Sequence, residues 1–397
     1  MRRGGDLLNK TMKTINQNNQ DLIIIGGGIM GLMTAYFASD FVKNITILEK
    51  NVIGKENKEA ASFSYTRSIR VDYLEPFYAA LANEAQTLWL EMEKQAKETL
   101  FVKCGCLNIA KKSITPNIDE TYAEKSYEVS KELKFEQIAY DKKELQQKFP
   151  QFEADLGRMD TKGGFLVVQS IIEFLLKELK KRNVTIEENI TVESIEEDTN
   201  VSIKTNKKTF VANKIVLTPG KGTNALLKLI KNNTQTFDIT YSRPQRKYYY
   251  PPKSIADNFL PENFPVFAYT DVGIYGHPIF DKKKNAVKVA YFVPVGIPKD
   301  EEKIKCVEDF VDACMPMLKN VPSEEITDAD NCWYDTVVDD DFILGKLPKF
   351  NNILIGTGWR GTGYKFAPLV GKILAQLALQ GTTVYDIKQF SPSRFSK

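Results

Sequence analysis

The feature that most constrains this chain is a glycine cluster near its start. The run Gly26-Gly-Gly-Ile-Met-Gly31 has the spacing G-x-G-x-x-G. It follows the apolar run Asp21–Ile25 and precedes Ile29–Phe41, where apolar side chains recur at helical spacing. Asn44–Leu48 then has the character of a second buried strand. This order of strand, tight turn, helix and strand predicts a βαβ unit in a parallel sheet that is buried on both faces.

Each glycine of the motif has a physical reason. Gly26 permits the tight turn, Gly28 lets a pyrophosphate approach the backbone, and Gly31 lets helix and strand pack closely. The free N–H groups of the helix start would face the phosphates. Glu49, which ends the second strand, can accept hydrogen bonds from ribose hydroxyls. The motif therefore predicts a dinucleotide site, but it does not decide between FAD and NAD.

Composition excludes several classes of protein. The 54 basic and 51 acidic residues are spread along 397 positions with no basic block, so nucleic acid is not an expected partner. Leu22–Phe41 contains three consecutive glycines and Asp40, which argues against a membrane span. The polar residues 1–20 lack a secretory apolar core, and we expect them to be a disordered tail.

The cysteines indicate a reducing compartment, and we expect a cytoplasmic protein. Five cysteines leave one over if they pair, and they form no spaced framework. Cys104-Gly-Cys106 is too short for the usual zinc spacing and has no second pair, so we interpret it as strand sequence and expect no metal site. The cysteines are Cys104, Cys106, Cys306, Cys314 and Cys332.

The remaining pattern predicts an α/β protein of two discontinuous domains. Glu75–Gln95 reads as a long amphipathic helix, Val102–Ile109 as a strand, and Tyr241–Tyr250 as part of a β-rich region. Strand and helix signals return at Ile353–Ile355 and at Pro368–Gln380, which Gly381 would cap. We expect a Rossmann-like nucleotide-binding domain from residues 21–98, 156–242 and 322–397, and a β-rich α+β substrate domain from residues 99–155 and 243–321.

Several motifs in fixed order resemble those of one flavoprotein family. They are Tyr65-Thr-Arg-Ser-Ile-Arg70, Lys214-Ile-Val-Leu-Thr-Pro-Gly220, Gly273-Ile-Tyr275, Lys288-Val-Ala-Tyr291, Cys332-Trp-Tyr-Asp-Thr-Val-Val-Asp-Asp-Asp-Phe-Ile-Leu344 and Gly356-Thr-Gly-Trp-Arg-Gly-Thr-Gly-Tyr-Lys-Phe366. Together they resemble the monomeric sarcosine oxidase family of D-amino-acid-oxidase-like flavoproteins, which includes N-methyltryptophan and pipecolate oxidases. The resemblance runs, with gaps, from about Asp21 to Phe390.

The resemblance implies that the nucleotide is FAD, so the first domain would be an FAD-binding domain. It also implies a thioether between a cysteine and the flavin, and Cys332 falls on that position; such a thiolate needs a positive or polar setting. The alternative is that Cys332 is a small buried apolar residue. The expected cofactor-binding residues are Gly26, Gly28, Ile29, Met30, Gly31, Glu49, Lys50, Arg67, Val192, Gly220, Cys332, Gly361, Gly363 and Lys365.

Three residues match catalytic positions of the family. Lys288 matches a lysine above the flavin, where the resemblance implies oxygen activation; a fixed cation there stabilises the negative charge of superoxide. Arg67 matches an arginine near the flavin ring, and Tyr275 lies in the aligned pocket segment. Alternatively, Lys288 is a solvated lysine of an ordinary strand.

Four residues are candidates for substrate binding. Arg70 and Lys365 match two cations that hold the substrate carboxylate, a role suited to a planar guanidinium and a point charge. The alternative for both is an internal ion pair or a surface charge. Tyr275 and His277 lie in the pocket segment, although a lone histidine is more often structural.

The chain departs from the family at three pocket positions, where Phe63, Phe292 and Thr362 replace common histidines. These changes argue against sarcosine itself and favour a bulkier or cyclic apolar amine. We therefore predict oxidation of the C–N bond of a secondary, cyclic or N-methyl amino acid to an imine, with O2 reduced to hydrogen peroxide by a monomeric enzyme. The alternatives are a flavin dehydrogenase with another electron acceptor, an NAD(P)-dependent oxidoreductase, and a non-catalytic nucleotide-binding module.

Overall fold

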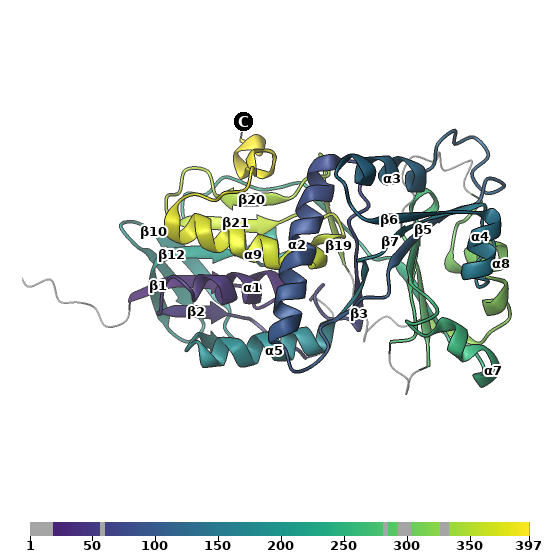
Figure 1. The fold of residues 1–397 in the computed structure, drawn as a ribbon. Coiled ribbons are helices and arrows are strands. Elements are labelled where there is room, and N and C mark those ends of the chain that lie inside the picture. Colours follow the sequence, from purple (N-terminus) through teal and green to yellow (C-terminus); the bar gives the residue numbers. More distant parts are fainter. Residues whose placement is uncertain (1–18, 56–59, 281–284, 293–302, 326–332, 397) are drawn as a thin grey trace, which may run out of the picture.

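A computed structural model of the chain describes residues 19–396, except 56–59, 281–284, 293–302 and 326–332. Within these ranges the strands form two large sheets, with a three-stranded sheet and a two-stranded sheet beside them. The two large sheets occupy opposite ends of the molecule in Figure 1, with the long helix α2 (Pro76–Gln95) between them. No described helix is long and apolar enough to cross a membrane.

The first large sheet contains the predicted βαβ unit. β1 (Asn19–Ile25) lies between β2 (Ile45–Leu48) and β12 (Thr209–Leu217) and runs parallel to both. The helix α1 (Ile29–Ala38) connects β1 to β2 and ends three residues before the predicted Phe41. The other strands of this sheet are β9 (Thr185–Glu187), β10 (Val192–Glu197), β11 (Val201–Thr205), β20 (Ile343–Lys346) and β21 (Ile353–Thr357).

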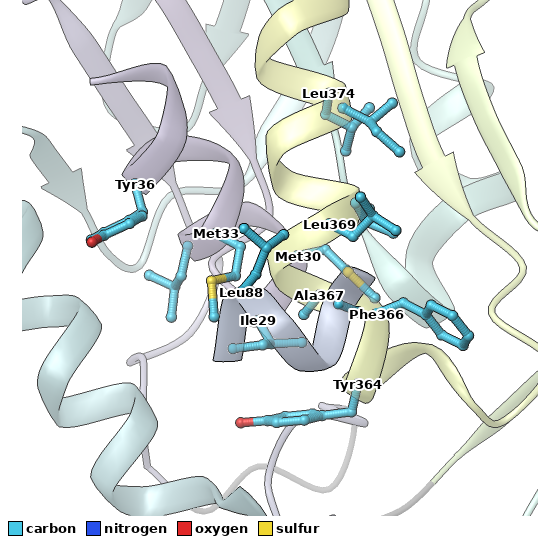
Figure 2. Close-up of a cluster of buried hydrophobic side chains, with 14 of the residues drawn as sticks. Ile29, Met30, Met33, Tyr36, Leu88, Tyr364, Phe366, Ala367, Leu369 and Leu374 are labelled. Carbon is cyan, nitrogen blue, oxygen red and sulfur yellow. The ribbon is translucent and has the colours of Figure 1, made fainter. Parts of the chain in front are cut away.

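The C-terminal part of the chain completes this sheet. β12 pairs antiparallel with β11 through its first half and parallel with β21 through its second half. The following helix α9 (Gly363–Gln380) packs directly on α1. Figure 2 shows Met30 and Met33 of α1 beside Ala367 and Leu369 of α9. The approach is close, because a Cβ added at Gly371 would lie 2.5 Å from the backbone carbon of Met33.

The second large sheet is mostly antiparallel, and its one parallel pairing joins β5 to β15. Its own apolar core includes Phe267, Phe310 and Tyr269, all fully buried. Its strands are β5 (Cys106–Ala110), β6 (Gln137–Asp141), β7 (Leu156–Asp160), β14 (Gln245–Tyr249), β15 (Val266–Tyr269), β16 (Ile274–His277), β17 (Val287–Tyr291) and β18 (Ser323–Glu325).

Two small sheets lie beside the large ones. β3 (Thr66–Ile69), β8 (Gly164–Val167) and β4 (Phe101–Val102) form one, and β13 (Ile239–Ser242) pairs with β19 (Tyr334–Val337) to form the other. The α/β class with a mixed parallel sheet and a separate β-rich sheet is therefore confirmed. The remaining helices are α3 (Tyr122–Glu132), α4 (Lys142–Lys148), α5 (Val168–Lys181), α6 (Thr223–Leu227), α7 (Lys253–Ala256) and α8 (Val307–Cys314).

Several predicted elements need correction. The predicted strand Val102–Ile109 is two strands in different sheets, because Gly105 turns the chain with φ 83°. Tyr241–Tyr250 is likewise split between β13 and β14. The last helix begins at Gly363, with Pro368 inside it rather than at its start. The predicted tail of residues 1–20 is too long, since Asn19 already pairs with Val211.

The domain boundaries stay a prediction, but strand pairing bears on two of them. β7 and β18 pair within the second sheet. By sheet membership the β-rich part therefore extends past the predicted limits at residues 155 and 321.

Candidate active site

A cavity of about 1120 Å³ is lined by residues of both large sheets. The glycine motif and Glu49 line it from the first sheet, whereas Tyr275 and Lys288 line it from the second. The turn before α9 and strand β3 contribute further walls through Gly361 and Arg67. The cavity therefore brings together predicted site residues that lie far apart in the sequence.

The three glycines of the motif have different structural reasons: two allow close packing within the protein, and one faces the cavity. Gly26 has φ 113°, and a Cβ there would lie 2.3 Å from the carbonyl oxygen of Thr218. A Cβ at Gly31 would lie 1.9 Å from the carbonyl oxygen of Gly26. Gly28 differs, because among the described atoms a Cβ there would approach Ser62 Oγ alone, at 3.2 Å. Gly28 also lines the cavity. The first and third glycines serve the fold, and the second leaves room for a ligand.

Glu49 is held in place at the end of β2. Its Oε2 accepts a hydrogen bond from the backbone N–H of Gly27 at 2.7 Å, and its Oε1 accepts one from Asn51 at 2.9 Å. Each carboxylate oxygen keeps a further lone pair, so the group can still accept hydrogen bonds from a bound ribose. Lys50 lines the cavity beside it.

The other predicted cofactor positions surround the same cavity. Ile29, Met30, Val192 and Gly220 line it, and no described atom lies within 4 Å of a Cβ built at Gly220. A dinucleotide requires a helix N-terminus, a fixed carboxylate and a stretch of backbone that side chains leave open. The cavity offers all three. The donor set therefore fits FAD. Cys332, predicted to carry the flavin, lies outside the described residues.

The turn before α9 approaches its neighbours closely. Gly361 has φ 69°, and a Cβ there would lie 2.6 Å from the ring of Tyr334. A Cβ at Gly363 would lie 2.5 Å from that of Trp359. Side chains at these positions would collide with the wall, so the glycines keep the backbone N–H groups of the helix start beside the cavity.

Arg67 lies on the cavity wall with its guanidinium fixed by main-chain oxygens. Nη2 donates to the carbonyl of Ala61 at 2.7 Å and Nη1 to that of Thr66 at 3.2 Å. The guanidinium carbon lies 5.7 Å from the ring centroid of Tyr364. These contacts hold a permanent positive charge beside the cavity.

Arg70 and Lys365 lie on the same wall, but Arg70 already has an anionic partner. Its Nη1 lies 2.7 Å from Oδ1 of Asp72, so the predicted alternative of an internal ion pair is realised for Arg70. Burial alone would lower the pKa of Arg70, but the Asp72 charge opposes it and the pKa lies above its usual value. Burial and the charge of Arg70 hold the pKa of Lys365 well below its usual range, although Asp72 acts in the opposite direction.

Lys288 is buried rather than solvated, with only 1 % of its surface exposed. It lies in β17 opposite His277 of β16 and lines the cavity. Its Nζ is 5.9 Å from the ring centroid of Tyr275, a second predicted site residue. The interpretation of Lys288 as an ordinary solvated lysine is therefore wrong.

His277 lies in the cavity wall with both ring nitrogens engaged. Nδ1 lies 2.6 Å from Oγ1 of Thr66, and Nε2 lies 2.8 Å from Oγ of Ser68. The ring is fully buried and lies 6.0 Å from that of Phe165. These bonds tie β16 to β3, so the structure gives His277 a connecting role between two sheets.

Sequence reasoning missed several polar residues at this site. Tyr122 at the start of α3 lines the cavity, yet its segment carried no motif. Asp335 is buried on the wall, and its Oδ2 accepts from the N–H of Gly358 at 3.1 Å. Burial raises the pKa of Asp335 to about 7, against backbone N–H donors that lower it. Phe292 and Thr362 line the cavity as predicted, whereas Phe63 is not among its described lining residues.

Comparison with known proteins assigns the chain to a class. The profile of the FAD dependent oxidoreductase family matches residues 21–377, and the chain belongs to that family. It is therefore an FAD-dependent oxidoreductase, in agreement with the cradle described above.

Individual relatives refine the picture. The chain is 29 % identical to the peroxisomal sarcosine oxidase of Homo sapiens, over 94 % of this chain and 96 % of the relative. It is 26 % identical to an N-methyl-L-tryptophan oxidase of Salmonella agona, over 95 % and 99 %. Its fold matches L-proline dehydrogenase from P. horikoshii with a TM-score of 0.77 at 17 % identity, over 95 % and 98 % of the two chains.

Proposed function

We propose that this protein oxidises the C–N bond of a carboxylate-bearing amine to an imine and passes the electrons to O2. The observation that carries the proposal is a wall where the guanidinium of Arg70 and the buried amine of Lys365 line a cavity continuous with the FAD cradle. A largely enclosed guanidinium and a buried amine favour an anionic group between them. The sarcosine and N-methyltryptophan oxidases among the relatives are named for such amino acids.

Bound FAD would supply the acceptor for the two electrons and the hydrogen removed from the carbon beside the amine. The chain itself would bind and orient the substrate: Arg70 offers a planar fork to a carboxylate, and Lys365 adds a second charge. A carboxylate beside Lys365 would raise the pKa of that amine, so we expect the anion to bind together with a proton. This arrangement would orient the reacting carbon without using His277, the one histidine of the chain, as a general base.

Lys288 is proposed to serve the oxygen step. O2 must accept two electrons and two protons to become hydrogen peroxide, and negative charge develops as the first electron arrives. A buried cation that lines the cavity stabilises that charge without further reorganisation. Lys288 is not needed to bind the substrate carboxylate, because Arg70 and Lys365 are proposed to bind it.

Aromatic rings near the cavity favour an apolar substrate body. The rings of Tyr275 and Phe292 lie 6.1 Å apart, and those of Phe292 and Tyr334 lie 6.3 Å apart. All three residues line the cavity. We therefore propose a secondary, cyclic or N-methyl amino acid with an apolar side chain as the substrate class.

A peroxide-coupled screen of matched compounds tests this function. Each amino acid would be compared with its methyl ester and its decarboxylated amine, in air and with an artificial dye as electron acceptor. We expect turnover of the free amino acids alone, with peroxide formed in proportion to substrate. Equal turnover of the decarboxylated amines would reject the carboxylate site, and rapid dye reduction without peroxide would indicate a dehydrogenase.

Covalent attachment of FAD through Cys332 is proposed separately, from the resemblance in its motif. Acid-precipitated protein should keep the flavin, and Cys332→Ala should release it. Cys104→Ala is a matched control, because Cys104 is a free cysteine that does not line the described cavity. Flavin found wholly in the supernatant of the wild-type protein would contradict the proposal.

We also propose that the enzyme is a cytoplasmic monomer. Light scattering of the purified protein and a fluorescent fusion in cells would test the two statements. A dimeric mass or a punctate organelle pattern would contradict them.

A further inference from the structure

Asp72 lies immediately behind the proposed carboxylate site and is almost wholly buried, with 4 % of its surface exposed. Both its side chain and its main chain accept from the same nitrogen of Arg70: Oδ1 at 2.7 Å and the carbonyl oxygen at 2.5 Å. Arg70 lines the cavity, whereas Asp72 is not among the described lining residues. Asp72 therefore holds the guanidinium from behind and leaves its other donors on the cavity side.

The segment around Asp72 is anchored from the second sheet. The Tyr122 hydroxyl donates to the carbonyl oxygen of Asp72 at 3.0 Å, and the Tyr122 N–H donates to Asp271 at 2.9 Å. The N–H of Val71 donates to Asp160 Oδ2 at 3.0 Å. Contacts of this kind restrict the segment in position, and with it the arginine.

The guanidinium is also enclosed by aromatic rings. Its carbon lies 5.0 Å from the ring centroid of Tyr73 and 5.9 Å from that of Tyr122. Both rings line the cavity. Arg70 therefore has little freedom to turn away from Asp72 when a ligand enters.

The negative charge of Asp72 has a second effect. A substrate carboxylate that binds Arg70 must approach a buried anion that already accepts from the same guanidinium, and like charges in a buried site repel strongly. The other carboxylate oxygen of Asp72, Oδ2, has no hydrogen-bond partner among the described atoms, so its charge is poorly compensated. Asp72 thus positions the arginine and weakens the attraction of the arginine for anions.

We propose that Asp72 is a positioning residue that sets the anion affinity of the site: it fixes Arg70 at the cavity wall and competes with the substrate carboxylate for its charge. This inference rests on the proposed function, in which Arg70 binds that carboxylate. It adds a residue that does not touch the substrate and explains why the permanent charge of Arg70, whose side chain is only 14 % exposed, is tolerated without a ligand.

Binding measurements on the holoenzyme test the inference independently of turnover. Acetate and methylthioacetate would be titrated into the wild type and Asp72→Asn by calorimetry and by flavin absorbance. The asparagine oxygen can still accept from Arg70, so the substitution removes mainly charge. We expect both carboxylates to bind roughly tenfold more tightly to Asp72→Asn, the equivalent of about one pKa unit of interaction.

Two controls separate charge from shape. Acetamide, which has no charge, should bind the two proteins equally within about twofold. Arg182 and Asp40 form an ion pair of the same 2.7 Å separation, and neither residue lines the cavity. Asp40→Asn should therefore leave carboxylate affinity unchanged. If Asp72→Asn binds carboxylates no more tightly than the wild type, the inference is overturned. If the wild type binds neither carboxylate, the proposed function fails with it.

A second variant covers the case in which Asp72→Asn does not fold or loses its flavin. Tyr122→Phe keeps the aromatic ring and removes the hydroxyl, which donates to the carbonyl oxygen of Asp72 and also contacts the side chain of Arg70. Loss of these contacts should loosen Arg70 and weaken carboxylate binding by roughly two- to tenfold. Unchanged affinity in this variant would overturn the positioning role.

Discussion

The nucleotide cradle and the carboxylate wall are built in different ways. The centre of the cradle comes from one continuous stretch, β1 to Glu49, whose shape follows from backbone geometry at Gly26 and Gly31 and from the close approach of Thr218. The wall joins Arg70 after β3, Lys365 in α9 and Tyr122 in α3, and its character follows from charges that face one another. The cradle depends mainly on local sequence, whereas the wall depends on which segments the fold brings together.

The largest expected effect is at the cradle. Gly31→Ala would place a Cβ 1.9 Å from the carbonyl oxygen of Gly26, a contact that the backbone cannot relieve without moving the turn. We expect purified Gly31→Ala to contain no FAD and to melt at a lower temperature than the wild type. Flavin absorbance and a thermal melt measure both results.

Gly222→Ala is the matched control for the cradle. Gly222 also lines the cavity, but an added Cβ would come no closer than 3.9 Å to Pro219, and its φ of −81° suits any residue. This variant should keep its flavin. A normal flavin content in Gly31→Ala would show that the close approach of helix and strand is not what shapes the cradle.

Substitutions in the carboxylate wall should change the affinity for carboxylates and leave the FAD content unchanged. Arg70→Ala should keep FAD but lose about 2–5 kcal/mol of binding to carboxylate inhibitors, the usual result of breaking a desolvated charge pair. Inhibition constants for acetate and methylthioacetate provide the measurement. Arg182→Ala, which breaks an ion pair of equal length away from the cavity lining, should leave those constants unchanged. Equal losses in the two variants would mean that Arg70 is only structural.

A substitution of Lys288 tests whether carboxylate binding and oxygen activation depend on different positively charged residues. Lys288→Met should slow the oxygen-dependent half of turnover by about 100- to 1,000-fold and leave the substrate-dependent half nearly unchanged, since one preorganised charge is lost. Stopped-flow measurements of the two halves decide this. Lys247→Met on the neighbouring strand β14 is the control, because Lys247 pairs with Glu308 and does not line the cavity. Similar slowing of both halves would refute the assignment.

The same contrast explains what the sequence could and could not predict. The βαβ unit and the reasons for Gly26 and Gly31 were predictable, because strand period, turn geometry and helix packing act over neighbouring residues. The split of Val102–Ile109 was not, since both halves have strand character and only Gly105 marks the turn. Asp72 was missed as well. A carboxylate two residues after Arg70 looks solvated until the fold buries it.

The proton held by Asp335 links the stability of the wall to pH. Burial raises the pKa of Asp335 to about 7 in the folded protein, above the value of about 3.9 for an exposed carboxyl. The folded state therefore holds this proton more tightly, so stability should fall as pH rises from about 4 to 7, by about 1.4 kcal/mol for each pKa unit of difference.

Asp335→Asn should remove this dependence, so its melting temperature should improve relative to the wild type between pH 4 and pH 7. Thermal melts of the holoenzyme across this range measure the difference, with the exposed Asp257→Asn as the control. A constant difference between the two melting curves would show that Asp335 does not take up the proton.

The packing of α1 against α9 has a consequence for how the protein is made. Figure 1 shows the purple helix of the N-terminal unit beside the yellow helix of the C-terminal end. At about 5–20 residues per second, the ribosome completes α9 roughly 17–70 s after α1. During that interval the apolar face of Met33 lacks the partner that buries it. Nascent or truncated chains that end before Gly363 should therefore aggregate and require chaperones, even though the glycine motif itself is complete.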